Sequence, residues 1–353
     1  MENELISKLE KSIEQIKEKN ARIYFFIQET KGNAKASIRY MYDFALTLHK
    51  NGYNTIMLTE KPDYTPIESW LPGDYNQIPH QPIEGGTLAI APEDLLFLPE
   101  IFGFVMEQVK NLPCAKIVIA QAYDHILETL QPGASWPEYG FLKCITTSDS
   151  LKTQIMKTMR GVHYDVIEPL ISESFVEQVV PPKPIISVHT REQRDGINLI
   201  KEFYLRFPQY RWVTFRDLRG LSENEFASAL KESFVSIWID QTSGFGTFPL
   251  ESMKCNVPVI GKIPKNEPDW LGENGMWVGD ESKIIEVLGT YVLAWLEGVE
   301  LKDEVKQKMK DTLLPYSTEI TKSNIITIFD SFKNKRIEAI EKALNKIKQE
   351  ETV

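Results

Sequence analysis

The spacing of apolar positions changes from one segment of the chain to the next, and this spacing predicts where strands and helices lie. Residues 21–28 form an almost unbroken apolar run, which is typical of a buried strand. Residues 35–51 alternate apolar and polar positions at helical spacing and end before Gly52, a residue type that commonly closes helices. Residues 53–61 then form a second apolar run. The pattern therefore predicts a strand, a helix and a second strand.

This alternation continues through the first half of the chain and restarts after a proline-rich segment. Short β-rich runs, separated by helical segments, follow at residues 93–100, 115–122, 143–148 and 164–170. Three prolines in residues 177–184 interrupt both spacings, which favours a linker. Beyond it, further apolar runs lie at residues 185–190, 211–218, 234–240, 257–261 and 275–280. Strands that alternate with helices indicate right-handed βαβ units around parallel sheets.

We therefore predict an α/β protein with two Rossmann-like, doubly wound domains that face a cleft. Open sheets of this kind bind ligands at the carboxyl ends of their strands, so we expect the binding site between the two domains. The expected order is an N-terminal amphipathic helix (1–20), an N-terminal acceptor-side domain (21–176), a linker (177–184), a C-terminal donor domain (185–330) and a C-terminal amphipathic helix (331–353).

Each end of the chain carries a narrow apolar stripe at alternating steps of three and four residues. Such a stripe is too short to form a stable helix alone, so each helix must dock onto another surface. Two arrangements stay open: the terminal helices pack within one chain, or they form a homodimer contact. The stripes consist of Ile6, Leu9, Ile13 and Ile16 at one end and of Ile337, Ile340, Leu344 and Ile347 at the other.

Charge and cysteine usage narrow the classes of function. The net charge of −10 repels phosphodiester backbones, and no local basic patch stands out, so we expect no nucleic-acid partner. The three cysteines have neither disulfide nor metal-site spacing, which favours a reducing, cytoplasmic setting and no metal. We expect neither a signal peptide nor a transmembrane segment, and a peripheral membrane association stays open.

The stretch "SGFGTFPLESMKCNVPVIGK" starts just after the predicted strand 234–240 and suggests a ligand site. Gly244 and Gly246 allow a backbone to approach a ligand closely, and a helix is expected to start near Phe248. The free N–H groups of that helix end suit a phosphate. Glu251 is expected in the first turn, where a carboxylate also stabilises the helix dipole, so a purely structural role is the alternative for this residue.

The same stretch resembles the signature of a known family, the group-1 retaining family of GT-B nucleotide-sugar glycosyltransferases. That signature is roughly E-G-F-G-x-x-x-x-E-A-M-x-x-G-x-P-V. The resemblance extends over most of residues 21–330, because the segments before the linker and the closing helices are also similar to this family. The matching positions here are Gly244, Phe245, Gly246, Leu250, Glu251, Met253, Pro258 and Val259.

The resemblance implies roles for the residues of this stretch. Glu251 corresponds to the glutamate that accepts hydrogen bonds from the ribose hydroxyls of the nucleotide, a role that suits an ionised carboxylate. Ser243 stands where the family has its first glutamate, which touches the donor sugar, and a serine does not supply that charge. The resemblance assigns donor binding to Ser243, Gly244, Phe245, Gly246, Thr247, Glu251 and, in the N-terminal domain, Gly32.

The resemblance also implies a basic pair that holds the pyrophosphate after the first strand of the donor domain. We expect Arg191 and Arg194 to form this pair, while Asp195 stands where the family has a lysine before its glycine, here Gly196. Guanidinium groups can bind the pyrophosphate at two points and stabilise the departing diphosphate without a metal. A solvent-exposed role is the alternative for each arginine.

In the N-terminal domain, the family often places a histidine near the donor sugar, after the strand at 115–122. The aligned position is Gln121, with Asp124 and His125 slightly downstream, and we take His125 as the catalytic candidate. The sequence contains no G-x-G-x-x-G segment, which counts against a nicotinamide dehydrogenase. Arg216 and Arg219 lie just past residues 211–215 and are weaker candidates for contact with a base or a phosphate.

The favoured function is a retaining, metal-independent glycosyltransferase for polysaccharide or glycoconjugate synthesis. It would move a hexose-type sugar from a nucleoside diphosphate sugar of UDP or GDP type to a saccharide or lipid-linked acceptor, with no cofactor. Ser243 and Asp195 leave a second hypothesis open: a catalytically impaired GT-B scaffold or carbohydrate-binding protein. A sugar-nucleotide epimerase or a phosphorylase with the same cleft is the third.

Overall fold

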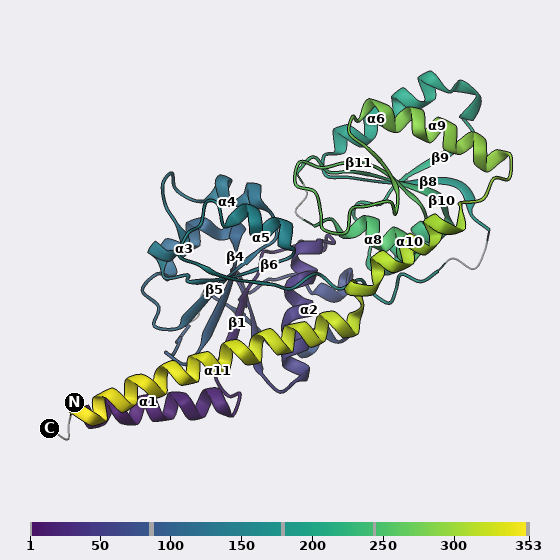
Figure 1. Ribbon diagram of the computed structural model, residues 1–353. Helices are drawn as coiled ribbons and strands as arrows, with labels where there is room; N and C mark the ends of the chain where they lie inside the picture. Colours follow the sequence, from purple (N-terminus) through teal and green to yellow (C-terminus); the bar gives the residue numbers. More distant parts are fainter. Residues whose placement is uncertain (1, 85–87, 178–180, 243–244, 351–353) are drawn as a thin grey trace.

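The chain folds into two α/β halves joined by two crossings (Figure 1). The computed structural model describes residues 2–84, 88–177, 181–242 and 245–350. Within these ranges each half contains one sheet, and every strand pair is parallel. The predicted α/β architecture with two Rossmann-like domains is confirmed. None of the helices described is both long and apolar enough to cross a membrane.

The first sheet has the order β3-β2-β1-β4-β5-β6-β7 among the described residues. The interior strand β1 has four of its five residues buried, because helices cover both of its faces. The strands are β1 (Arg22–Phe26), β2 (Asn54–Thr59), β3 (His80–Pro82), β4 (Leu95–Pro99), β5 (Ala115–Ala120), β6 (Lys143–Thr146) and β7 (His163–Val166).

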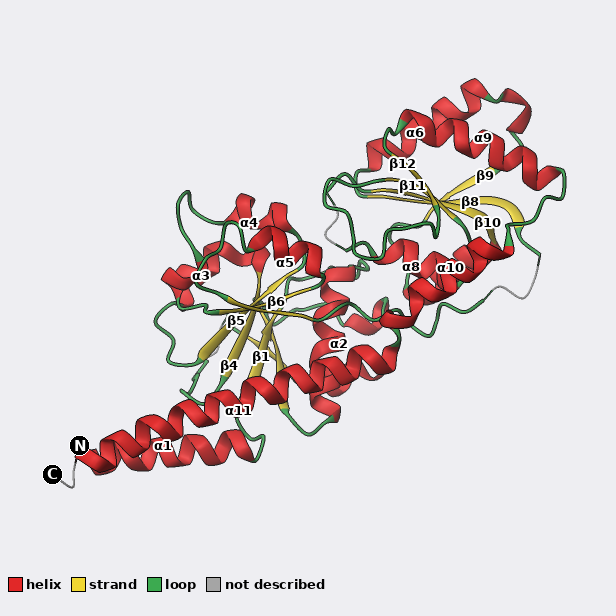
Figure 2. Ribbon diagram, in the orientation of Figure 1, coloured by secondary structure: helices red, strands yellow, loops and turns green. Residues whose placement is uncertain are grey.

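Helices cover both faces of this first sheet (Figure 2). They are α2 (Ala36–Lys50), α3 (Gly103–Val109), α4 (Tyr123–Thr129), α5 (Asp149–Ile155) and the C-terminal α11 (Thr318–Glu350). Phe25 packs against α2 and α11 on one face, while its neighbour Tyr24 packs against α3, α4 and α5 on the other. Successive strand residues point to opposite faces, so an unbroken apolar strand needs a helix layer on each side.

The second sheet has the order β12-β11-β10-β8-β9 among the described residues. The cores on its two faces contain Trp238 on one side and Ile237 on the other, both from the fully buried β10. The strands are β8 (Lys183–Thr190), β9 (Thr214–Asp217), β10 (Ser233–Ile239), β11 (Val259–Lys262) and β12 (Met276–Val278). The helices are α6 (Gln193–Arg206), α7 (Glu223–Glu232), α8 (Thr247–Lys254), α9 (Ser282–Leu296) and α10 (Asp303–Leu313).

The chain passes between the two halves at two neighbouring places. The first crossing runs from Ile167, in the core of the first half, to Ile171, in the core of the second. The second crossing runs from Tyr316, in the core of the second half, to Ile325, in the core of the first. The backbone N–H of Ile171 donates to the carbonyl of Tyr316 (3.4 Å), so the two crossings touch.

The terminal helices pack against each other. Helix α1 (Glu2–Lys17) lies along the C-terminal part of α11 (Figure 1). Of the two arrangements left open by the sequence, the described chain shows the internal one, with a core of Ile13, Ile16, Ile337 and Leu344. The C-terminal helix begins at Thr318, not at the expected residue 331, and the expected linker 177–184 overlaps the start of β8 at Lys183.

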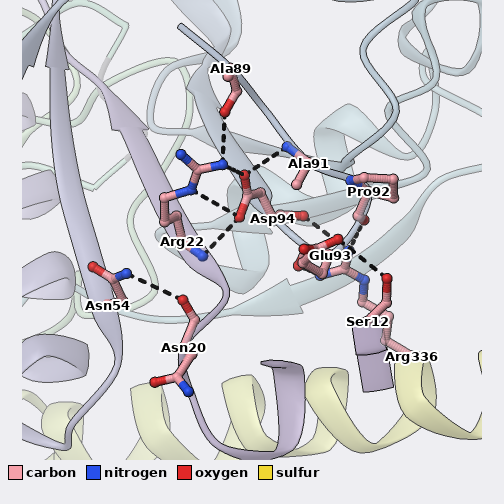
Figure 3. A network of polar contacts seen from close by, with 10 residues as sticks. All are labelled: Ser12, Asn20, Arg22, Asn54, Ala89, Ala91, Pro92, Glu93, Asp94 and Arg336. Carbon is pink, nitrogen blue, oxygen red and sulfur yellow. Dashed lines mark hydrogen bonds and ion pairs between the residues drawn. The ribbon is translucent and has the colours of Figure 1, made fainter. Parts of the chain in front are cut away.

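A buried group of charges ties α11 to the starts of the strands of the first sheet (Figure 3). Asp94, which precedes β4, accepts from the guanidinium of Arg22 (2.7 Å) and from the backbone N–H groups of Arg22 and Ala91 (2.9 and 2.8 Å). Arg336 of α11 donates to the carbonyls of Pro92, Glu93 and Asp94 at 2.5–3.0 Å. We call Arg22, Asp94 and Arg336 the Asp94 network.

Candidate functional site

A cavity of about 220 Å³ lies between the two halves of the molecule. The N-terminal part of α2 and Trp70 form its wall on the first half, and β8, the segment 218–226 and α8 form its wall on the second. The cavity therefore lies where the carboxyl ends of parallel strands open, as expected for open α/β sheets. In the described ranges, no group of three or more His, Cys, Asp and Glu side chains is arranged to hold a metal ion.

The glycine-containing loop leads directly into α8, whose first residue lines the cavity. Ser243 and Gly244 lie outside the described residues. Gly246 has a φ of +70°, a backbone conformation that favours glycine, and it immediately precedes α8. The side chain of Phe245 is buried in the second core, and its carbonyl accepts from the indole Nε1 of Trp270 (2.6 Å). The side chain of Phe245 therefore packs behind the loop, and donor binding by this residue stays a prediction.

Thr247 and Glu251 lie one turn apart on α8, and both line the cavity. The helix starts at Thr247, so Glu251 lies in its second turn. The expected position in the first turn is wrong. Burial raises the pKa of the Glu251 carboxyl to about 7, while the nearby Arg39 and a hydrogen bond with Thr247 act in the opposite direction. Glu251 is therefore partly protonated near neutral pH and faces the interdomain space.

Charged side chains from both halves gather around Glu251. Arg39 of α2 forms ion pairs with Asp43, four residues later (3.3 Å), and with Glu223, the first residue of α7 in the other half (2.6 Å). The side chains of Arg39, Asp43 and Glu223 are only 12%, 8% and 7% exposed. We call Arg39, Asp43, Glu223 and Glu251 the cleft cluster, and its ion pairs join the two domains beside the cavity.

Sequence reasoning identified Glu251 but missed the other three members of the cleft cluster. One signal was present: Arg39 and Asp43 are charged residues at i and i+4 on the apolar side of a helix whose neighbouring positions are buried. Glu223 gave no such signal, because it lies inside the capping box formed by Ser222 and Glu225 and resembled a helix-start residue.

His189, at the end of β8, is a further cavity residue that sequence reasoning missed. Its ring stacks on Phe248 with centroids 5.0 Å apart and an angle of 18° between the planes. Burial lowers the pKa of His189 to about 4, although Asp240 and Asp217 act to raise it. His189 is therefore neutral near pH 7, and its Nδ1 has no hydrogen-bond partner among the described residues.

Arg191 reaches across the interdomain space, but neither Arg191 nor Arg194 lines the cavity. The guanidinium of Arg191 pairs with Asp124 of the first half (2.5 Å) and with Asp240 at the end of β10 (3.7 Å), and it also donates to Thr242. Arg194 is exposed on the first turn of α6. The structure therefore shows one arginine of the expected pair in contact with both domains.

His125 lies on α4, next to the Asp124 that pairs with Arg191. Its Nδ1 lies 3.3 Å from the carboxylate of Glu100, which is almost fully buried and which also accepts from the backbone N–H of Ala122. The hydrogen bond with Glu100 raises the pKa of His125, against the effect of burial. Gln121, at the aligned position, donates to the carbonyl of Ser37 (3.1 Å).

The other expected residues are divided between the cavity and its surroundings. Gly32 has a φ of +75° in the turn after β1, and the cavity wall begins two residues later, at Ala34. Arg219 lines the cavity and pairs with Asp217. Arg216 instead pairs with Glu232 (2.8 Å).

The comparisons with known proteins identify the fold. Neither the protein-family models nor the curated protein sequences gave a match to this chain. Among solved structures, sucrose-phosphate synthase from Thermosynechococcus elongatus is similar to 88% of this chain over 99% of its own length, with a TM-score of 0.64 and 11% sequence identity. A glycosyltransferase from Rickettsia africae covers the same share of this chain and 98% of its own, with a TM-score of 0.56 and 12% identity.

A third similar structure, HepE from Anabaena in complex with UDP and glucose, matches 88% of this chain and all of its own, with a TM-score of 0.61 and 12% identity. All three neighbours are matched over nearly their whole length, and the similarity includes both domains. The chain therefore has the GT-B fold, in which two Rossmann-like domains face each other.

Proposed function

We propose that this protein is a retaining glycosyltransferase that takes a sugar from a nucleoside diphosphate sugar of UDP or GDP type. The observation that carries the proposal is the position of Glu251, whose carboxyl lines the interdomain cavity at the start of α8. This position agrees with the role that the sequence resemblance implies, the acceptance of hydrogen bonds from two vicinal ribose hydroxyls. The acceptor would be a saccharide or a lipid-linked sugar, as in polysaccharide or glycoconjugate synthesis.

Two kinds of observation support a nucleotide ligand. HepE, a structural neighbour, has been crystallised with UDP, with UDP-glucose and with UDP and glucose. In the chain itself, apolar and aromatic side chains, among them Trp70, Phe226 and Phe248, line the cavity beside the carboxyl of Glu251. Apolar walls with a few polar groups are typical of sites that bind small organic ligands.

In the proposed mechanism, the diphosphate would leave from the front face of the sugar, where the acceptor also attacks. The N–H groups at the start of α8 would receive the negative charge that develops on the diphosphate, together with Arg191 once it has exchanged Asp124 for the ligand. No protein nucleophile is then required. Closure of the two domains would exclude water, which would otherwise hydrolyse the donor.

A mass-spectrometric screen of nucleotide sugars, for binding and for slow hydrolysis, tests the proposal. We expect one donor class to bind, and we expect Glu251→Ala to weaken binding at least about tenfold, as for the loss of charge-assisted hydrogen bonds. Glu225→Ala is the matched control, because Glu225 is an exposed carboxylate of the capping box on α7. Equal affinity in the wild type and Glu251→Ala would remove Glu251 from its assigned role.

A second candidate is a scaffold or carbohydrate-binding protein with this fold. Two observations favour it: Ser243 replaces a glutamate of the family signature, and Arg191 is already paired with Asp124. Calorimetry with UDP and with GDP separates the candidates. Binding of either nucleotide favours the transferase, whereas binding of oligosaccharides alone favours the second candidate.

A further inference from the structure

Arg39 lies among more carboxylates than one guanidinium can neutralise. Its Nε contacts Asp43 (3.3 Å), its Nη1 contacts Glu223 (2.6 Å), and its charge also acts on Glu251. Burial alone would lower the pKa of Arg39, but the surrounding carboxylates outweigh this effect and raise it. Arg39 is therefore a fixed cation, and which carboxylate it pairs with depends on geometry.

Glu223 is held in place from several directions. Its Oε1 accepts from the hydroxyls of Ser172 (2.5 Å) and Ser174 (2.7 Å), which come just after the first crossing between the domains. Its backbone N–H donates to the carbonyl of Trp70 in the first half (2.9 Å). With Oε1 occupied by the two serines, Oε2 faces the guanidinium of Arg39. The carboxylate of Glu223 is therefore oriented before any ligand arrives.

Glu251 has a hydrogen bond with Thr247 but is not held by an ion pair. No ion pair with its carboxyl is formed by any of the described residues, although Arg39 lies close enough to influence it. The charged and titratable groups that line the same cavity are Lys35, Arg39, Tyr40 and Asp43 on the first half and His189, Arg219 and Glu223 on the second. Arg219 is taken by Asp217, so Arg39 is the charged neighbour whose pairing decides the state of Glu251.

We propose that Glu223 is a positioning residue that holds Arg39 away from Glu251 and thereby leaves the Glu251 carboxyl free to accept from a ligand. Without this restraint, Arg39 would turn toward Glu251 and form an ion pair across the cavity, in the space that vicinal hydroxyls would occupy. The assignment of the ligand rests on the proposed function. The effect of Glu223 on Glu251 does not, because it concerns the free protein.

The test is a carboxyl titration of the whole chain labelled with ¹³C-glutamate, in which Glu251→Gln identifies the Glu251 resonance. We expect Glu223→Gln to lower the titration midpoint of Glu251 by about one pH unit, as for a carboxylate that gains a guanidinium partner. Adding Arg39→Met to Glu223→Gln should bring the midpoint back toward that of the wild type. Glu225→Gln, on the same turn of α7, should leave it unchanged.

Two results would overturn the proposal. An unchanged midpoint in Glu223→Gln would show that Glu223 only joins the domains. Because Arg39 itself lowers the pKa of Glu251, Arg39→Met alone is the reference for the double variant. An equal fall caused by Glu223→Gln in the wild-type and in the Arg39→Met background would show that the lost charge of Glu223, and not the movement of Arg39, is responsible. If Glu223→Gln does not fold, Glu223→Asp takes its place, because aspartate keeps the charge and the helix start but has a shorter side chain. A lower Glu251 midpoint in Glu223→Asp supports the proposal, and an unchanged midpoint contradicts it.

Calorimetry with UDP and GDP distinguishes this inference from the proposed function. If the wild type binds neither nucleotide, the proposed function fails, while the titration still decides whether Glu223 controls Glu251. If the wild type binds one of them, we expect Glu223→Gln to weaken that binding about tenfold and the additional Arg39→Met change to recover part of the loss, since an occluding ion pair must first be broken. No recovery would contradict the role of Arg39 as the blocking group.

Discussion

The cleft cluster and the Asp94 network both surround buried carboxyl groups, but they differ in how completely those carboxyls are hydrogen-bonded. In the Asp94 network, Asp94 is 1% exposed and accepts four hydrogen bonds through its two oxygens, while Arg336 donates to three carbonyls. In the cleft cluster, one guanidinium serves several carboxylates, and Glu251 is left with a raised pKa.

The position of the two groups explains this difference. The Asp94 network lies at the starts of β1 and β4, the edge of the first sheet that is turned away from the second domain, where charges can only hold the fold together (Figure 3). The cleft cluster lies between the domains and beside a cavity. An unneutralised buried carboxyl costs stability, and such costs are concentrated at functional sites. A buried carboxyl that lacks an ion-pair partner, and not the burial of charge alone, therefore distinguishes the candidate site from the Asp94 network.

The largest expected effect comes from breaking the Asp94 network. Asp94→Ala leaves the Arg22 guanidinium without its partner and removes the acceptor of two backbone N–H groups, so we expect a loss of about 3–5 kcal/mol in the free energy of unfolding. Urea denaturation measures it. Asp74→Ala removes an exposed partner of Lys50 and should cost less than about 0.5 kcal/mol. Similar losses in both variants would contradict the comparison.

The opposite sign is expected in the cleft cluster. The carboxyl of Glu251 has a pKa of about 7 in the folded protein, against an ordinary value of 4.5. Between these two values the folded protein holds a proton that the unfolded chain has released, so the stability contributed by Glu251 falls as the pH rises. Glu251→Gln should therefore stabilise the protein by about 2–3 kcal/mol at pH 8 and by almost nothing near pH 4.5.

Urea denaturation of the wild type and Glu251→Gln at several pH values between 4.5 and 8 measures this effect. Glu225→Gln is the control, because hydrogen bonds with Ser222 lower the pKa of the exposed Glu225 and its removal should destabilise the helix start slightly. A Glu251→Gln variant that is less stable than the wild type at pH 8 would show that this carboxylate is neutralised in the folded protein.

Nucleotide binding should depend on the same proton. If ionised Glu251 accepts from ribose hydroxyls, the UDP affinity should rise about tenfold between pH 6 and pH 8, because the ionised fraction rises by that factor around a pKa of about 7. Calorimetry in two buffers of different ionisation enthalpy would detect the released proton near pH 6. An affinity that does not change with pH, with no proton released, would contradict this use of Glu251.

The smallest effect is expected at the half-exposed bridge between Arg191 and Asp124. Asp124→Asn should change the free energy of unfolding by less than about 0.5 kcal/mol, because solvent screens this pair. It should also improve UDP affinity a few-fold, since Arg191 no longer has to leave a carboxylate before it meets the diphosphate. Calorimetry should show a gain of UDP affinity in Asp124→Asn and a loss in Arg191→Met. An equal loss of affinity in the two variants would show that Asp124 assists binding.

The sequence was sufficient for the architecture because each strand and helix has its own periodicity. Apolar runs at strand spacing, separated by segments at helical spacing, predicted the two parallel sheets. The position of the loop before α8 followed from its glycines, of which Gly246 indeed has a positive φ. These features depend on residues that are close together in the sequence, and local chemistry determines them.

The cleft cluster could not be predicted in the same way. Arg39 and Glu223 come from different domains, and only the relative placement of the two sheets brings them to within 2.6 Å. The burial of the Phe245 side chain could not be predicted either, because its ring packs on Tyr316 and its carbonyl accepts from Trp270, and both partners lie downstream in the sequence. His189 was overlooked because a histidine within an apolar strand does not reveal which helix will stack on its ring.

The two contiguous crossings place both chain connections between the domains together. Ile171 and Tyr316 are hydrogen-bonded to each other there, so this is where the two domains would hinge, while Arg39–Glu223 and Arg191–Asp124 bridge their facing walls. A hinge of this kind permits opening and shutting but opposes sliding and twisting. Groups on facing walls would then separate and meet again in the same register in every cycle, so each shutting would return Glu223 to Arg39.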